Sequence, residues 1–256
     1  MGTVVTFDLY NGNHVAPGDL CVQVARASAL LRRADALFST WKEHSPISQI
    51  RRGEISEEDA PPEIAEVLEA CAEAQRVSEG WFDPWSMPGG VDPTGYVKGW
   101  AAQRALGVLV TAGVTGAIVN AAGDVATCGS PEADTPFRIG IVDPHSPRRL
   151  ACVVETIGAI ATSGTYERGT HLIDPHSGER RSRVASASVT GADLGLADAL
   201  ATALAVAGVD GLSFIELADG YEGFVICWDG SRHSTSGFPF APMEPPTPIS
   251  APAAGT

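Results

Sequence analysis

Hydrophobic residues recur along this chain with the two periods that secondary structure imposes. Alternation of apolar and polar positions predicts a strand over residues 3–10. Helical spacing predicts helices over 19–38, 62–80, 96–113 and 193–207. Further strands are expected at 117–119, 137–142, 152–157, 186–190 and 224–228. The polar stretch 39–53 shows neither period, so we expect an irregular loop there.

The order of these elements favours one fold class. Strands come in runs with few helices between them, which favours an α+β fold over a doubly wound sheet. We therefore expect mixed or antiparallel sheets with packed helices, in a single compact unit of two interlocked halves. The chain has 256 residues, 44% of them hydrophobic, and this excludes a mainly disordered protein. We expect the unit to span 1–237, with a disordered Pro-rich tail over 238–256.

The net charge, the cysteines and the apolar stretches limit which partners and which cellular compartment we expect for this protein. The 17 Lys and Arg against 31 Asp and Glu give a net charge of −14, which argues against nucleic-acid or anionic-membrane surfaces. The apolar stretch 194–206 is interrupted by Asp198 and Thr202 and is too short to span a bilayer, so we expect no membrane span. Five scattered cysteines argue against a disulfide framework or a zinc site. No signal peptide is recognisable, so we expect a cytoplasmic protein.

Polar residues in an apolar helix are the first candidates for chemistry. Asp198 and Thr202 stand four positions apart, so they share one face of the predicted helix 193–207. A carboxylate and a hydroxyl offer two oxygen ligands to a hard cation such as Mg²⁺, which usually retains waters and substrate phosphates. The alternative is that Thr202 bonds a helical carbonyl and Asp198 lies near an exposed surface.

Three further segments carry candidate groups. His171 precedes a predicted turn and could act as a general base near neutral pH, or be a plain loop residue. Gly95 and Lys98 stand at a loop that leads into a helix, an arrangement that suits phosphate but also fits a simple helix start. Trp81 and Phe82 could hold a flat ring or belong to the core. Familiar nucleotide and hydrolase signatures are missing from the sequence.

Taken together and in order, eight segments resemble the ApbE family of Mg²⁺-dependent FAD:protein FMN transferases. The resemblance covers roughly residues 1–228. Its segments are MGT at 1–3, FSTW with SPIS within 38–48, GWFDP at 80–84, DPTGYVKGWA at 92–101, NAAGD at 120–124, ATSG at 161–164, HLIDPHSG at 171–178 and ADALATA at 197–203.

The resemblance implies an ApbE-like fold, an activity and a set of site residues. It implies that FMN passes from FAD to a Thr or Ser hydroxyl of an acceptor flavoprotein, with release of AMP. His171 would be the general base. Mg²⁺ would be held by Asp198, Thr202 and the backbone carbonyl of Gly95. The FAD site would be lined by Met1, Thr40, Trp41, Trp81, Phe82, Asp83, Lys98 and Ile173.

The sequence also departs from the family pattern. Only residues 85–91 separate the GWFDP and DPTGYVKGWA segments, which is shorter than is usual in the family. Thr94 and Ala122 each replace a glycine of the family pattern. Many relatives are exported, whereas this sequence starts at the motif itself, which agrees with a cytoplasmic form. Two alternatives remain at this point: an FAD pyrophosphatase that gives FMN and AMP, and a non-catalytic flavin-binding module.

Overall fold

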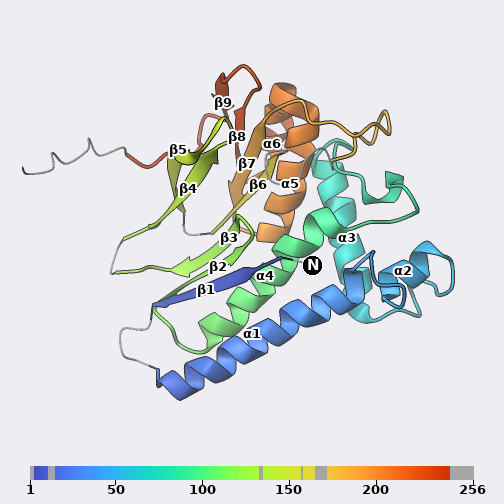
Figure 1. Cartoon of the computed structure of the whole chain (residues 1–256), viewed down its shortest axis with the longest axis horizontal. Helices are drawn as coiled ribbons and strands as arrows, with labels where there is room; N and C mark the ends of the chain where they lie inside the picture. The colour runs from blue at the N-terminus through green and yellow to red at the C-terminus, as the bar shows by residue number, and fades with distance from the viewer. Residues whose placement is uncertain (1–2, 11–14, 133–134, 157, 165–171, 243–256) are drawn as a thin grey trace, which may run out of the picture.

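A computed structural model describes residues 3–10, 15–132, 135–156, 158–164 and 172–242 (Figure 1). Met1 and His171 therefore lie outside the described residues, and both assignments stay predictions. The helices are α1 (Pro17–Phe38), α2 (Pro46–Arg51), α3 (Pro62–Val77), α4 (Thr94–Thr111), α5 (Leu194–Ala207) and α6 (Leu212–Leu217). Short 3₁₀ turns cover Pro84–Ser86 and Gly208–Gly211.

The strands form one large and one small antiparallel sheet. The seven-stranded sheet has the order β1-β2-β3-β6-β7-β8-β9, and a separate hairpin joins β4 to β5. The strands are β1 (Val5–Tyr10), β2 (Gly116–Ala121), β3 (Asp124–Gly129), β4 (Phe137–Asp143), β5 (Ser146–Thr156), β6 (Ala159–Gly164), β7 (Ser186–Gly191), β8 (Glu222–Ile226) and β9 (Arg232–Ser234). The expected α+β class with antiparallel sheets and packed helices is confirmed.

Each face of the large sheet has its own hydrophobic core. One face packs against α4 and α5, and α1 lies along the outer side of α4 (Figure 1). The small side chains of Ala126, Ala161 and Ala187 on that face allow the helices to approach closely. The other face carries Val125 and Ile160, which pack with residues of the β4–β5 hairpin. Alternation along each strand therefore separates the two cores.

The two central helices touch where α4 carries a glycine. A Cβ added at Gly99 would stand 2.2 Å from the carbonyl oxygen of Leu194, at the start of α5. Only glycine allows this approach of helix to backbone. Because the helices are so close, Lys98 of α4 and Asp198 of α5 become neighbours.

Two expectations about the chain were wrong. Residues 39–53 are not wholly irregular, because α2 forms within them, with the Ser45 hydroxyl accepting from the backbone N–H of Ser48. A six-residue helix is too short for a periodic signal in the sequence. The expected boundary at 237 was also wrong, because Phe238 is buried in the second core and the backbone N–H of Ala241 donates to the carbonyl oxygen of Val153. Residues 243–256 lie outside the described residues.

The segment Leu194–Leu217, which contains α5 and α6, is long and apolar enough to cross a membrane, contrary to the sequence expectation. Its most apolar window has a mean hydropathy of 1.6, and 61% of that window is buried inside the fold. Burial of this kind is what the core helix of a folded domain shows, so the segment is weak support for a membrane span.

The turn between β2 and β3 carries a residue with a strained backbone. Ala121 pairs with Asp124, so Ala122 and Gly123 alone form the turn, with φ values of 52° and 94°. Such two-residue turns favour glycine because a Cβ is disfavoured at positive φ. We expect Ala122→Gly to raise the free energy of unfolding by about 0.5–1 kcal/mol, as measured by urea denaturation. Gly123→Ala should lower it, and equal stability of all three proteins would contradict this account.

Candidate functional site

The sheet register gathers several motif segments at one place. Val5, at the start of β1, pairs with Ala121, so the N-terminal strand begins beside the β2–β3 turn. Asp124 follows that turn, and its Oδ1 accepts from the backbone N–H of Thr162 on β6 at 3.0 Å. Segments that are far apart in the sequence therefore meet next to the contact between α4 and α5.

A lysine between two buried carboxylates forms the centre of this site. The ammonium of Lys98 makes an ion pair with Asp124 and lies 3.6 Å from Oδ1 of Asp198. Asp124 is fully buried and Asp198 is 2% exposed, whereas the Lys98 side chain is 21% exposed. The cluster therefore reaches the surface only through Lys98. The alternative that Asp198 lies near an exposed surface is wrong.

The position of Asp198 perturbs its proton affinity. Burial raises the pKa of Asp198 above the ordinary value, because desolvation penalises the charged carboxylate. The Lys98 ammonium opposes this shift in pKa, and the neighbouring Asp124 carboxylate adds to it. The backbone N–H of Gly99 also donates to Oδ2 of Asp198 at 3.2 Å. Burial therefore favours the protonated carboxyl of Asp198 unless positive charge lies close to it.

Thr202 lies one turn further along α5, beside the start of α4. Its hydroxyl is 3.3 Å from the hydroxyl of Ser163 on β6. A Cβ added at Gly95 would come within 3.5 Å of Oγ1 of Thr202 and 3.1 Å of the Phe82 ring. The structure thus brings Gly95, Thr202 and Phe82 together, although they come from three separate motifs. The side-chain oxygen atoms that meet here are the hydroxyls of Thr202 and Ser163.

Trp81 stands between two side chains of the segment after β6. Its ring makes an edge contact with the His176 ring, with centroids 4.4 Å apart. The guanidinium carbon of Arg183 also lies 4.9 Å from the Trp81 ring centre. Trp81 is half-buried and Phe82 is buried. The aromatic pair therefore has one core residue and one at the surface.

The other predicted FAD residues are spread around this centre. Asp83 begins the 3₁₀ turn, and its carboxylate accepts from the backbone N–H groups of Trp85 and Ser86. Ile173 forms a β-bridge with Arg180. Thr40 is half-buried, and the Trp41 side chain is 96% exposed. Within the described part of the chain, these four residues make no hydrogen bond or ion pair with Lys98 or Asp198, so their assignment to the FAD site stays a prediction.

Sequence reasoning gave no role to Asp124, Thr162 or Ser163, although the motifs NAAGD and ATSG contain them. Their roles depend on contacts across the sheet and with α5, which no local pattern reveals. The only hint in the sequence that these three residues have a role was their place in two of the family's motifs. Charged or hydroxyl residues at the ends of buried strands needed partners, and the tertiary structure supplies them.

The side chain of Arg51 holds the short loop before α4 in place through hydrogen bonds. Its guanidinium donates to the carbonyl oxygens of Pro88, Gly90 and Val91 at 2.8, 3.1 and 3.0 Å. It also lies 3.7 Å from the carboxylate of Asp92, which accepts from the backbone N–H of Thr94. The last residue of α2 thus fixes the loop that leads to Gly95.

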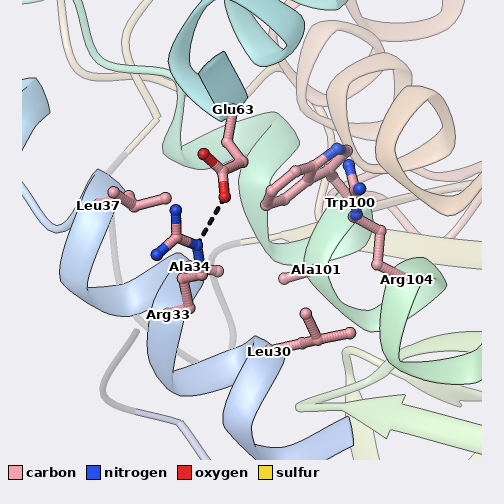
Figure 2. A pocket seen from close by; sticks show the side chains of 8 residues that line it. All are labelled: Leu30, Arg33, Ala34, Leu37, Glu63, Trp100, Ala101 and Arg104. Atoms are coloured by element: carbon pink, nitrogen blue, oxygen red, sulfur yellow. Dashed lines mark hydrogen bonds and ion pairs between the residues drawn. The ribbon is translucent and has the colours of Figure 1, made fainter. Parts of the chain in front are cut away.

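A small hollow lies on another face of α4, between α1 and α3 (Figure 2). Its volume is about 50 Å³, and the Arg33–Glu63 ion pair of 2.6 Å stands at its rim. The residues that line it are Leu30, Arg33, Ala34, Leu37, Glu63, Trp100, Ala101 and Arg104. These differ from the predicted site residues, so the hollow lies apart from the candidate site.

Comparison with solved structures places the fold in a known class. The chain resembles the flavin transferase ApbE from Vibrio cholerae with a TM-score of 0.79 and 21% identity, over 93% of this chain and 95% of that one. It resembles the apo form of the Pseudomonas stutzeri flavinyl transferase ApbE with a TM-score of 0.77 and 22% identity, over 92% and 93% of the two chains. The fold is therefore that of the ApbE flavin transferases, as the sequence resemblance implied.

The sequence comparison shows to which family the chain belongs. Residues 1–89 and 85–225 match the ApbE family, and the chain belongs to this family. A curated relative from Rhodobacter capsulatus, described as an FAD:protein FMN transferase, is 37% identical over 127 residues. That match covers 46% of this chain and 24% of the relative, so it spans about a quarter of the relative's length.

Proposed function

We propose that this chain transfers FMN from FAD to a Thr or Ser hydroxyl of an acceptor protein and releases AMP. Family membership and the match to an FAD:protein FMN transferase support this activity. The observation that carries it is the meeting of Lys98, Asp198 and Thr202 from two helices beside Gly95. One ammonium faces two carboxylates here, so the centre suits the phosphates of FAD once a cation such as Mg²⁺ joins it.

The proposed chemistry is a substitution at phosphorus. The oxygen of the acceptor hydroxyl bonds to the phosphorus of the FMN half, and the anhydride bond to the AMP half breaks. His171 takes the hydroxyl proton, and AMP leaves with the electrons of the broken bond. Such reactions depend mainly on positioning and on neutralising charge. Lys98 contributes an ammonium to that neutralisation, and Asp124 and Asp198 hold it in place.

Mg²⁺ is part of this proposal, and the available donors fit it. Among the described residues, no group of three or more His, Cys, Asp or Glu side chains is placed to hold a metal. The proposed donors are instead the Asp198 carboxylate, the Thr202 hydroxyl and the Gly95 carbonyl. These are hard oxygen ligands, and Mg²⁺ commonly takes few of them from protein while phosphates and waters supply the rest. When bound, Mg²⁺ would neutralise charge on the pyrophosphate.

A direct test incubates the purified protein with FAD and Mg²⁺, with and without EDTA. The mixture includes a candidate acceptor domain with a Thr-containing flavinylation site. We expect AMP release that EDTA suppresses, together with a fluorescent acceptor band on a denaturing gel. AMP and free FMN without a band would indicate a pyrophosphatase, in which water replaces the hydroxyl. Tight FAD binding without any AMP would overturn the proposal in favour of a flavin-binding module.

A further inference from the structure

An arginine cluster borders the candidate site and has no part in the chemistry proposed above. Arg180, Arg181 and Arg183 lie within four consecutive positions, and all three side chains are exposed. Across the described ranges of the chain, none of the three takes part in a recorded ion pair with a carboxylate. Seven other arginines do: Arg33, Arg51, Arg52, Arg76, Arg104, Arg138 and Arg232. Four more described arginines, Arg26, Arg32, Arg148 and Arg149, also make no such pair, so the location beside the predicted FAD site is what distinguishes the cluster.

The backbone places two of these arginines beside the segment that follows His171 in the sequence. Ile173 and Arg180 form an antiparallel bridge, and the backbone N–H of Arg181 donates to the carbonyl oxygen of Leu172 at 3.0 Å. The backbone N–H of Asp174 donates to the carbonyl oxygen of Glu179 at 2.9 Å, which closes the hairpin. Arg180 and Arg181 are therefore fixed in position by paired backbone rather than carried on a free loop.

The third arginine connects the cluster to the predicted FAD site. Arg183 lies over the Trp81 ring, and its Nη1 donates to the carbonyl oxygen of Ala207 at the end of α5. Its backbone N–H donates to the carbonyl oxygen of Ala205 at 2.9 Å. Arg183 thus lies against Trp81 and Arg180 is paired with Ile173, two residues assigned to the FAD site, and all three arginines remain exposed.

The positive charge of this arginine cluster contrasts with the negative net charge of the whole protein. A chain with net charge −14 repels acidic macromolecules on the whole. Three exposed arginines without a carboxylate partner among the described residues give this place a local positive charge, and planar guanidinium forks match carboxylates well. Complementary charge of this kind steers encounter and fixes the orientation of a protein partner.

We propose that Arg180, Arg181 and Arg183 form a docking surface for an acidic segment of the acceptor protein, next to the hydroxyl that receives FMN. This inference rests on the proposed function, because it assumes that the partner is the acceptor. The surface would hold Asp and Glu side chains of the acceptor while its Thr or Ser enters the site.

The test measures binding of two fluorescently labelled peptides by anisotropy at low and high salt. Both contain a Thr, which is flanked by Asp and Glu in one peptide and by Asn and Gln in the other. The variant is Arg180→Gln/Arg181→Gln, which spares Arg183 and its contact with Trp81. The matched control is Arg148→Gln/Arg149→Gln, an exposed adjacent pair on β5 that loses the same charge.

We expect the native protein to bind the acidic peptide more tightly than the neutral one, and more weakly as salt rises. The cluster variant should weaken binding of the acidic peptide about fivefold. The control variant should bind the acidic peptide as the native protein does. The dissociation constant for FAD, from a fluorescence titration, should be the same for all three proteins.

Several outcomes would overturn the docking surface. Equal binding of the two peptides by the native protein would remove the charge selectivity. Equal weakening in the control variant would show a response to net charge alone. Weaker FAD binding in the cluster variant would assign the arginines to the nucleotide phosphates. Selective binding of the acidic peptide without AMP release in the transfer assay would support the docking surface and overturn the proposed transfer.

Discussion

Asp198→Asn is expected to reduce AMP release from FAD by about 10³-fold, the scale of losing a charge that organises a phosphoryl-transfer site. The side chain keeps its shape and retains an oxygen for the backbone N–H of Gly99. What it loses is the negative charge that faces Lys98 and is proposed to hold Mg²⁺. The measurement is the initial rate of AMP release over a series of Mg²⁺ concentrations.

The control for this variant is Asp210→Asn, which removes one charge at an exposed position just after α5. It should release AMP at the native rate. Full activity of the Asp198 variant, with the native dependence on Mg²⁺, would remove Asp198 from the proposed ligands. A loss caused by unfolding is recognised from the thermal denaturation curve.

The same substitution should affect stability in the opposite direction. Because burial raises the pKa of Asp198, the folded protein binds a proton more tightly there than the unfolded chain does. The carboxylate therefore costs stability as the pH rises above the ordinary Asp pKa of about 3.9. In metal-free buffer, Asp198→Asn should unfold at a higher temperature than the native protein, with a gap that is larger at pH 8 than at pH 5. An equal gap at both pH values would contradict the direction of the shift.

His171→Gln is expected to lower the rate of FMN transfer by about 10²–10⁴-fold, the usual contribution of a general base. Glutamine can still accept and donate hydrogen bonds, but it does not take a proton near neutral pH. FAD binding should be retained, because the phosphates are assigned to Lys98 and the groups on α5. The measurements are the rate at which flavin fluorescence appears on the acceptor and the dissociation constant for FAD.

His233→Gln serves as the control, because His233 lies exposed on β9 at the edge of the sheet. It should transfer FMN at the native rate. If His171→Gln lost FAD binding as well as transfer, His171 would be a binding residue and the base would have to be sought elsewhere. If His171→Gln transferred FMN at the native rate at elevated pH, hydroxide would be replacing the histidine as the base.

Much of the fold followed from periodicity in the sequence. The long amphipathic helices α1 and α3 and the apolar helix α5 were predicted within a few residues of their observed ends. Strands β3 and β6 were not predicted, because their sequences DVATCG and AIATSG contain too few large apolar residues for a clear alternation. These two strands become strands by pairing with neighbours, since backbone hydrogen bonds across a sheet do not depend on side-chain pattern.

Eight motifs in order were enough to assign the chain to its family from sequence alone. The sequence also determined that Asp198 and Thr202 share a helix face, because a separation of four residues fixes that in any α-helix. The pairing of Asp124 with Lys98, of Arg180 with Ile173 and of Arg183 with Trp81 became visible in the folded structure alone. Contacts between residues distant in the chain depend on strand register and on the approach of α4 to α5 at Gly99, and no local pattern encodes either.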